Sequence, residues 1–111
     1  MLNLTADEQA WLDEYRRQLV EQFPGLVEDI IIFGPYARGI SDPDVDFNTL
    51  VLIKEGDRNK AGQVSYLGHM LDMTGFFVAP TIFVRNAAEW AKSKRDGGWM
   101  YDMVCDGISA L

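Results

Sequence analysis

The sequence predicts a single α/β (α+β) domain spanning 1–111, built on a small mixed β-sheet packed on one side by helices. Its 111 residues are too few for two independent cores, yet enough to bury roughly two-thirds of the unfolded surface. Apolar residues make up 48% and charged residues 24% of the chain, which is typical of a globular protein and not of a disordered one. Helical and extended patterns alternate along the sequence, which favours one layered α/β fold.

The first half of the chain predicts one helix and two strands. The capping box Thr5-x-x-Glu8 and apolar residues at helical spacing predict a helix over 6–22. The isoleucine-rich run 26–33 is typical of a buried strand, and the β-branched run 47–54 predicts a second one. The Gly- and Pro-rich segment between the two strands predicts a turn or a short irregular helix.

A two-sided helix and a third strand are predicted next. The helix covers 59–74, and its apolar residues form two stripes, Ala61, Val64, Leu67 and Leu71 on one face and Tyr66, Met70 and Met73 on another. Two stripes exceed what one small sheet needs, so we expect self-association or docking, that is, a homo- or hetero-oligomer. The run 76–84 predicts a strand, and its Pro80 indicates an edge position or a bulge.

Two further helices are predicted towards the end of the chain. Asn86-x-x-Glu89 caps a short helix that continues to about Ser93. Gly97-Gly98 then breaks the chain before a last helix. The residues spaced for one face of that helix are Trp99 or Met100, Met103, Val104 and Ile108.

Charge and composition exclude several classes of function. The formal net charge is −7 and the basic residues are scattered, which disfavours bulk nucleic-acid binding but leaves room for a small anionic ligand. The longest apolar runs fall far short of the roughly 20 residues that span a bilayer, and no secretory signal is visible, so we expect a cytoplasmic protein without a membrane segment. Cys105 is the only cysteine, which excludes an internal disulfide framework.

The segment between the first two predicted strands carries the candidate chemistry. Gly34 at a strand end lets the backbone approach an anion, and Arg38 adds a fixed positive charge. Oxygen-bearing side chains then alternate at Asp42, Asp44, Asp46 and Asn48. Those in extended chain point to one face, and such hard oxygen ligands favour magnesium.

The same segment has other interpretations. An EF-hand calcium loop fails, because its glycine would fall on Phe47 and its bidentate glutamate on Ile53. Arg38 is compatible with phosphate binding and equally with an ion pair to Glu28, to Asp29 or to an aspartate of the acidic cluster. Without wider context, a glycine turn followed by aspartates is more often a solvated loop than a site.

The segment resembles the minimal nucleotidyltransferases (MNT) of the DNA polymerase beta superfamily, which include the MNT antitoxins that pair with HEPN toxins. The family reads Phe-Gly-Ser-x-Ala-Arg-Gly and then Pro-Asp-Ser-Asp-x-Asp before an apolar strand. Here the pairs that match without a gap are Phe33-Gly34, Ala37-Arg38-Gly39 and Pro43-Asp44. Because the other elements fall in the family's order, the resemblance covers nearly the whole chain and implies a nucleotidyltransferase fold.

Two registers of the acidic cluster remain open. The ungapped register, preferred because it needs no deletion, places Asp46 on the first family aspartate, Asn48 on the second, and Pro35 on the serine. The other register takes Asp44 and Asp46 as the aspartate pair and needs a turn shorter by two residues. The two registers together predict Asp44, Asp46 and Asn48 as metal ligands. Asp44 and Asp46 are the predicted catalytic residues if the protein is active.

The resemblance implies nucleotidyl transfer by two metal ions held between carboxylates, with nucleotide phosphates at Gly34, Pro35, Tyr36 and Arg38. Pro35 cannot donate a hydrogen bond, Asn48 is neutral, and 76–84 offers no third acid. We therefore expect an MNT antitoxin-type domain with weakened or lost catalysis, which acts through a HEPN-like protein partner or through binding of ATP or another NTP with Mg²⁺. The alternative is an active metal-dependent enzyme that transfers AMP or another nucleotide to a protein or small-molecule hydroxyl.

Overall fold

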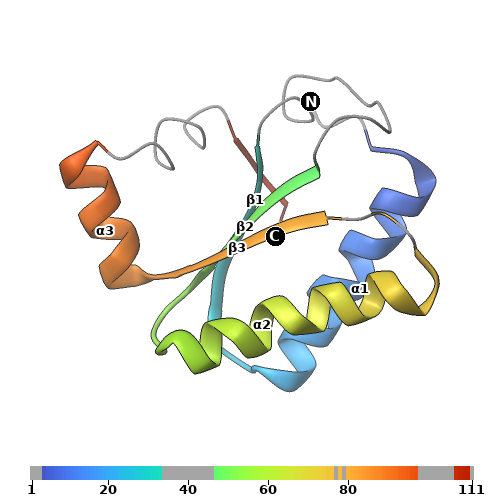
Figure 1. Ribbon diagram of the computed structural model, residues 1–111, viewed down its shortest axis with the longest axis horizontal. Helices are drawn as coiled ribbons and strands as arrows, with labels where there is room; N and C mark the ends of the chain where they lie inside the picture. Colours follow the sequence, from blue (N-terminus) through green and yellow to red (C-terminus); the bar gives the residue numbers. More distant parts are fainter. Residues whose placement is uncertain (1–3, 34–46, 77, 79, 98–106, 111) are drawn as a thin grey trace.

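A four-stranded mixed sheet, in the order β3-β2-β1-β4, forms the centre of the computed structural model, which describes residues 4–33, 47–76, 78, 80–97 and 107–110. The elements in chain order are α1 (Ala6–Gln22), β1 (Val27–Phe33), β2 (Phe47–Ile53), α2 (Arg58–Leu71), the π-helical turn η2 (Asp72–Phe76), β3 (Pro80–Asn86), α3 (Ala87–Asp96) and β4 (Ile108–Ser109). The predicted α+β class with a small mixed sheet is confirmed (Figure 1).

Both antiparallel and parallel pairing occur in the sheet. β1 and β2 are antiparallel. Phe33, the last residue of β1, lies opposite Asn48, the second residue of β2. β2 and β3 are parallel, with Asn48 opposite Thr81, and α2 forms the crossover between them. This arrangement makes β2 a central strand, and all seven of its residues are buried.

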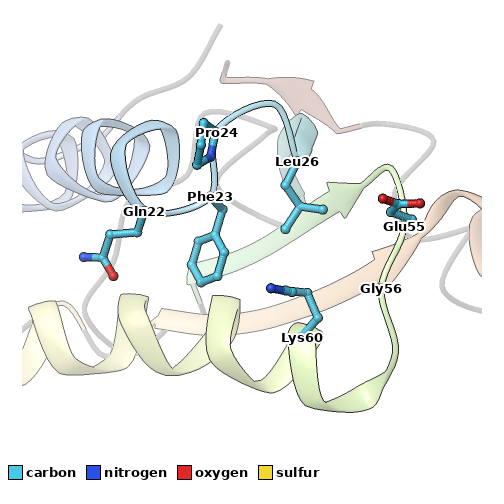
Figure 2. Close-up of a pocket in the computed structure, with 7 residues that line it drawn as sticks. All are labelled: Gln22, Phe23, Pro24, Leu26, Glu55, Gly56 and Lys60. Carbon is cyan, nitrogen blue, oxygen red and sulfur yellow. The ribbon is translucent and has the colours of Figure 1, made fainter.

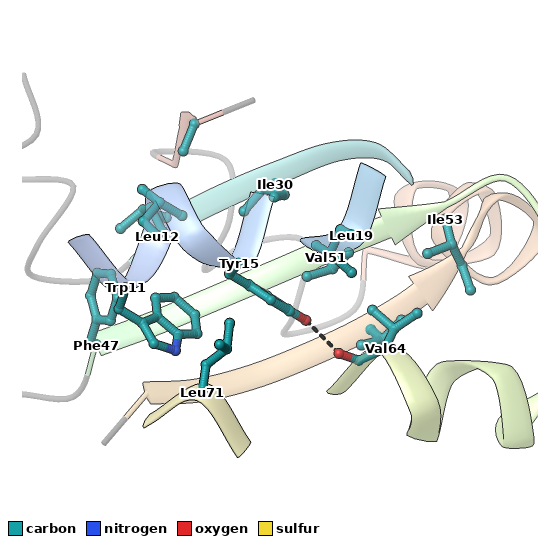
Figure 3. Close-up of a cluster of buried hydrophobic side chains, with 13 residues drawn as sticks. Trp11, Leu12, Tyr15, Leu19, Ile30, Phe47, Val51, Ile53, Val64 and Leu71 are labelled. Atoms are coloured by element: carbon teal, nitrogen blue, oxygen red, sulfur yellow. Dashed lines mark hydrogen bonds between the residues drawn. The ribbon is translucent and has the colours of Figure 1, made fainter. Parts of the chain in front are cut away.

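Helices α1 and α2 cover one face of the sheet together, and the main core lies beneath them (Figures 1 and 3). The indole nitrogen of Trp11 donates a 3.0 Å hydrogen bond to the carbonyl oxygen of Gly68, so the two helices are joined through the core. Gly68 is needed at this approach, because a Cβ atom there would lie 2.5 Å from Cδ1 of Ile82. The predicted stripe that contains Val64 and Leu71 is the buried one.

The opposite face of the sheet carries a second, smaller apolar cluster. Phe33, Leu50 and Leu52 are buried there, and Trp90 of α3 packs against them. The face under α1 and α2 is therefore covered by two helices, as expected for a sheet packed on one side. The opposite face receives the Trp90 side chain of α3.

Local signals predicted most element boundaries. In the capping box at α1, the Thr5 amide donates to Glu8 Oε1 and the Glu8 amide donates to Thr5 Oγ1, and α1 has the predicted bounds. Pro80 begins β3, which is an edge strand, as its missing amide hydrogen requires. Asn86 caps α3 as predicted, and the helix continues to Asp96.

Two predictions are corrected. The third strand begins at Pro80 and not at residue 76, because η2 occupies 72–76. Ile108 was predicted on a helix face but lies in β4, where it pairs with Ile32. The Ala110 amide extends this pairing with a 2.7 Å hydrogen bond to the Ile30 carbonyl, so long-range strand pairing outweighs the local helical spacing. The rest of the predicted last helix, at 98–106, lies outside the described residues.

No helix within the described ranges is both long and apolar enough to cross a membrane.

Candidate functional site

The predicted site lies at one end of the β1–β2 hairpin. β1 ends at Phe33 and β2 begins at Phe47, so the motif segment 34–46 connects the two strands at this end. The segment itself is outside the part of the chain that the structure describes. The predicted site residues that fall there are Gly34, Pro35, Tyr36, Arg38, Asp42, Asp44 and Asp46.

Asn48 is the predicted site residue that the structure describes. It is the second residue of β2, and only 8% of it is exposed. Alternation along the strand places it on the same face as Leu50, whereas Phe47 and Val51 join the core under α1 and α2. A neutral amide tolerates such burial, while an unpaired carboxylate at the same position would lose its hydration.

Among the described residues, those that pair with Asn48 carry no acidic side chain that could bind a cation. Phe33 lies opposite it on β1 and Thr81 on β3. β3, the strand parallel to β2, contains no Asp or Glu, and its one charged residue is Arg85. Within the described residues no group of three or more His, Cys, Asp or Glu could hold a metal ion. Within the described part of the chain, neither of the residues paired with Asn48 is acidic.

Thr49, the next residue of β2, carries a buried hydroxyl. Its Oγ1 atom has no hydrogen-bond partner among the described residues, and the residue is fully buried on the face that also holds Phe47 and Val51. A buried hydroxyl that is left unsatisfied costs about 1–3 kcal/mol. The sequence pattern gave no sign of this, because threonine fits the β-branched run of a strand.

A hollow of about 540 Å³ lies at the other end of the hairpin (Figure 2). Phe23, Pro24 and Leu26 form its apolar wall, and Lys60 and Glu55 bring the charges. The Lys60 ammonium group lies 5.4 Å from the centre of the Phe23 ring, a cation–π contact. None of the predicted site residues lines this hollow. Sequence reasoning missed it because its walls come from separate segments.

A second hollow, of about 390 Å³, lies where the parallel strands β2 and β3 end. The first turns of α2 and α3 both line it, and the charged lining residues offset each other, Arg58 and Arg85 against Asp57 and Glu89. The capping side chains of Asp57, Asn86 and Glu89 already occupy amides of these turns.

The pKa shifts lie on α1, away from both hollows and from Asn48. A hydrogen bond from Arg17, with a further one from Gln18, lowers the pKa of the Glu14 carboxyl to about 2. The same contact with Glu14 raises the pKa of Arg17. Burial raises the pKa of the Tyr15 phenol. Asp29, one of the predicted partners of Arg38, accepts hydrogen bonds from the Ile30 amide and the Ser109 hydroxyl.

Comparison with known proteins gives no relative: no family model, curated protein or solved structure matches the chain.

Proposed function

We propose that this protein is a nucleotidyltransferase-like domain of the MNT antitoxin type, with weakened or lost catalysis. It acts in the cytoplasm through a HEPN-type protein partner, or through binding of ATP or another NTP with Mg²⁺. The proposal rests on the motif between Phe33 and Asn48 and on the order of the elements around it.

The observation that carries the loss of catalysis is the setting of Asn48. In the ungapped register this residue takes the place of the second aspartate of the family. It is a neutral amide, 8% exposed, with Phe33 and Thr81 on either side and no acid on β3. Two metal ions bound next to a triphosphate need converging negative charge. Among the described residues, Asn48 and its strand partners supply none of this charge.

The arrangement of the strands supports the rest of the proposal. A helix, a strand, the motif segment and an antiparallel strand follow one another, and a crossover helix then leads to a parallel strand. This is the order that the resemblance implies. The motif segment connects β1 to β2, which are the two inner strands of the sheet, so a phosphate-binding turn there would be held between two paired strands.

Calorimetric titration with ATP and Mg²⁺ tests the nucleotide arm of the proposal, and incubation with labelled ATP and candidate acceptors tests catalysis. If the nucleotide arm is correct, we expect weak binding of ATP with Mg²⁺ and no transfer of label. Transfer that Asp46→Ala abolishes and Asn48→Ala preserves would overturn the proposal, and would establish the active enzyme that uses Asp44 and Asp46.

The partner arm is tested by gel filtration with a HEPN-type protein encoded next to this chain. We expect the two proteins to elute together as one complex. A chain that elutes separately from it at every concentration, and that also shows no heat of ATP binding, contradicts both arms.

A further inference from the structure

The outer face of α2 carries an apolar stripe that nothing in the described part of the chain covers. Tyr66, Met70 and Met73, the last of them in η2, are 64%, 36% and 73% exposed. The opposite side of the same helix buries Val64, Gly68 and Leu71 against the core. Figure 1 shows α2 on the outside of the sheet, beside α1. The second stripe of this helix is therefore a surface and not a second core.

A hollow of about 320 Å³ lies next to this stripe, one turn closer to the start of the helix. It is lined by Arg58, Asn59, Gly62, Gln63 and Tyr66. Residues 59, 62, 63 and 66 have the i, i+3, i+4, i+7 spacing of the four-residue hole that receives a side chain in helix–helix packing. Gly62 has no side chain to fill the hole, and the space beside it is open, since a Cβ atom there would meet nothing within 4 Å.

We propose that this stripe binds the same stripe of a second copy of this chain, with the two α2 helices antiparallel about a twofold axis close to Tyr66. The centre of the hole lies between residues 62 and 63, about one helical turn before Tyr66. Met70 lies about one turn after Tyr66. The twofold axis therefore places Met70 of each copy over the hole of the other. The inference does not rest on the proposed nucleotidyltransferase-like function.

Charge is complementary in the same arrangement. Arg58 begins α2 and Asp72 follows its last residue, and both lie on the flank of the helix that faces β3. In an antiparallel pair equivalent flanks meet, so Arg58 of each copy comes near Asp72 of the other. The N-terminus of each helix also lies beside the C-terminus of its partner, where their dipoles attract.

The neighbouring helix α1 does not oppose this contact strongly. Its outer residues Glu14 and Glu21 both bind Arg17, so this group of three side chains carries a net charge of only −1. One helix face is small compared with the standard protein interface. We therefore expect a dimer that forms in the micromolar range and dissociates on dilution.

Sedimentation of the full chain over a concentration series measures this equilibrium. We expect the wild type to pass from monomer to dimer, and Met70→Glu to raise the dissociation constant at least tenfold. Val20→Glu is the matched control, since Val20 is 66% exposed on α1. Gln18, which lies two residues before Val20 on α1, lines a hollow together with Met70. Val20 lies about 200° around α1 from Gln18 and therefore faces away from that hollow. Its substitution should leave the dissociation constant unchanged. Thermal unfolding verifies that both variants fold.

Cross-linking locates the axis. In a Cys105→Ser background, Tyr66→Cys should give covalent dimers with a short bis-maleimide, because residue 66 of the two copies meets at the axis. Val20→Cys in the same background should give none. A wild-type chain that stays monomeric at all concentrations overturns the proposal. So does a dimer that is insensitive to Met70→Glu, or equal cross-linking of the two cysteine variants.

Discussion

The phenol of Tyr15 donates a 2.7 Å hydrogen bond to the carbonyl oxygen of Val64, so that a side chain of α1 binds the backbone of α2 inside the core (Figure 3). The indole of Trp11 makes the same kind of contact with the carbonyl of Gly68, one turn further along α2. The rings of Trp11 and Tyr15 lie 5.0 Å apart. These two bonds satisfy the polar atoms of large buried side chains and fix how α1 lies against α2.

Tyr15→Phe should lower the free energy of unfolding by about 1–2 kcal/mol, because it removes one buried hydrogen bond and keeps the ring. Urea denaturation of both proteins measures the difference. Tyr66→Phe is the control, since Tyr66 is largely exposed, and in dilute solution it should change stability little. Equal losses in the two variants would contradict the role of the bond to Val64.

Stability should fall at alkaline pH because of Tyr15. Burial raises the pKa of this phenol above its ordinary value of 10.0, so the unfolded chain releases the proton at a lower pH than the folded one. The contribution of Tyr15 to the free energy of unfolding is fully present below about pH 10 and decreases as the pH rises above this value. Unfolding free energies measured between pH 8 and 11 should fall more steeply for the wild type than for Tyr15→Phe. Parallel curves would show that Tyr15 is not the cause.

Two glycines of α2 should respond to alanine in opposite directions. At Gly68 a Cβ atom would lie 2.5 Å from Ile82 and 3.1 Å from Tyr15, so Gly68→Ala should cost about 1–3 kcal/mol. At Gly62 the space is open, and Gly62→Ala should stabilise the helix by about 0.5–1 kcal/mol. Thermal unfolding in dilute solution compares them. A stabilising Gly68→Ala would mean that α1, α2 and β3 approach less closely than described.

Asn86 has two separable tasks. Its side-chain oxygen Oδ1 accepts a hydrogen bond from the Glu89 backbone amide, which caps α3. Its side-chain nitrogen Nδ2 donates to the Gly56 carbonyl oxygen, 2.9 Å away. Asn86→Ala loses both contacts and should cost about 1–2 kcal/mol. Asn86→Asp keeps the cap and loses the donor, so its cost in a urea titration should be smaller. An aspartate variant as unstable as the alanine variant would assign the effect to the contact with Gly56.

Asn48→Asp tests the proposed reason for weak metal binding. It places a carboxylate at a position that is 8% exposed, and in EDTA it should lower stability by at least about 2 kcal/mol. If the ungapped register is correct, the new carboxylate joins Asp46, and millimolar Mg²⁺ should raise the melting temperature of this variant only. Asn48→Ala is the neutral control. A melting temperature that does not respond to Mg²⁺ would contradict the register.

The sequence predicted the elements that depend on local chemistry. A capping box set the start of α1, Pro80 marked an edge strand, and Asn86 capped α3. The start of β3 was not predictable, because Gly75 adopts φ 146° within η2 and delays the strand. Ile108 was misplaced because its strand depends on a partner, Ile32, that lies far away in the sequence.

The candidate site was predicted in part. Asn48 was expected in the strand that follows the motif, and it lies there. Its burial follows from the central position of β2 in the sheet, which periodicity within the strand does not reveal. The two hollows beside Phe23 and Arg85 depend on how separate segments meet, so no single stretch of sequence indicated them.

The pairing of β4 with β1 has a consequence for protein synthesis. Hydrogen bonds beyond the β1–β4 ladder also hold this end of the chain: the Ser109 hydroxyl donates to Asp29, the Ala110 amide donates to Ile30, and the Arg16 guanidinium donates to the Ala110 carbonyl. The Arg16 bond joins residues that are 94 positions apart. While the ribosome is still translating, the nascent chain therefore displays one side of β1 without its neighbour. A transcript truncated before Ile108 would release a polypeptide with that side open to strand pairing between molecules.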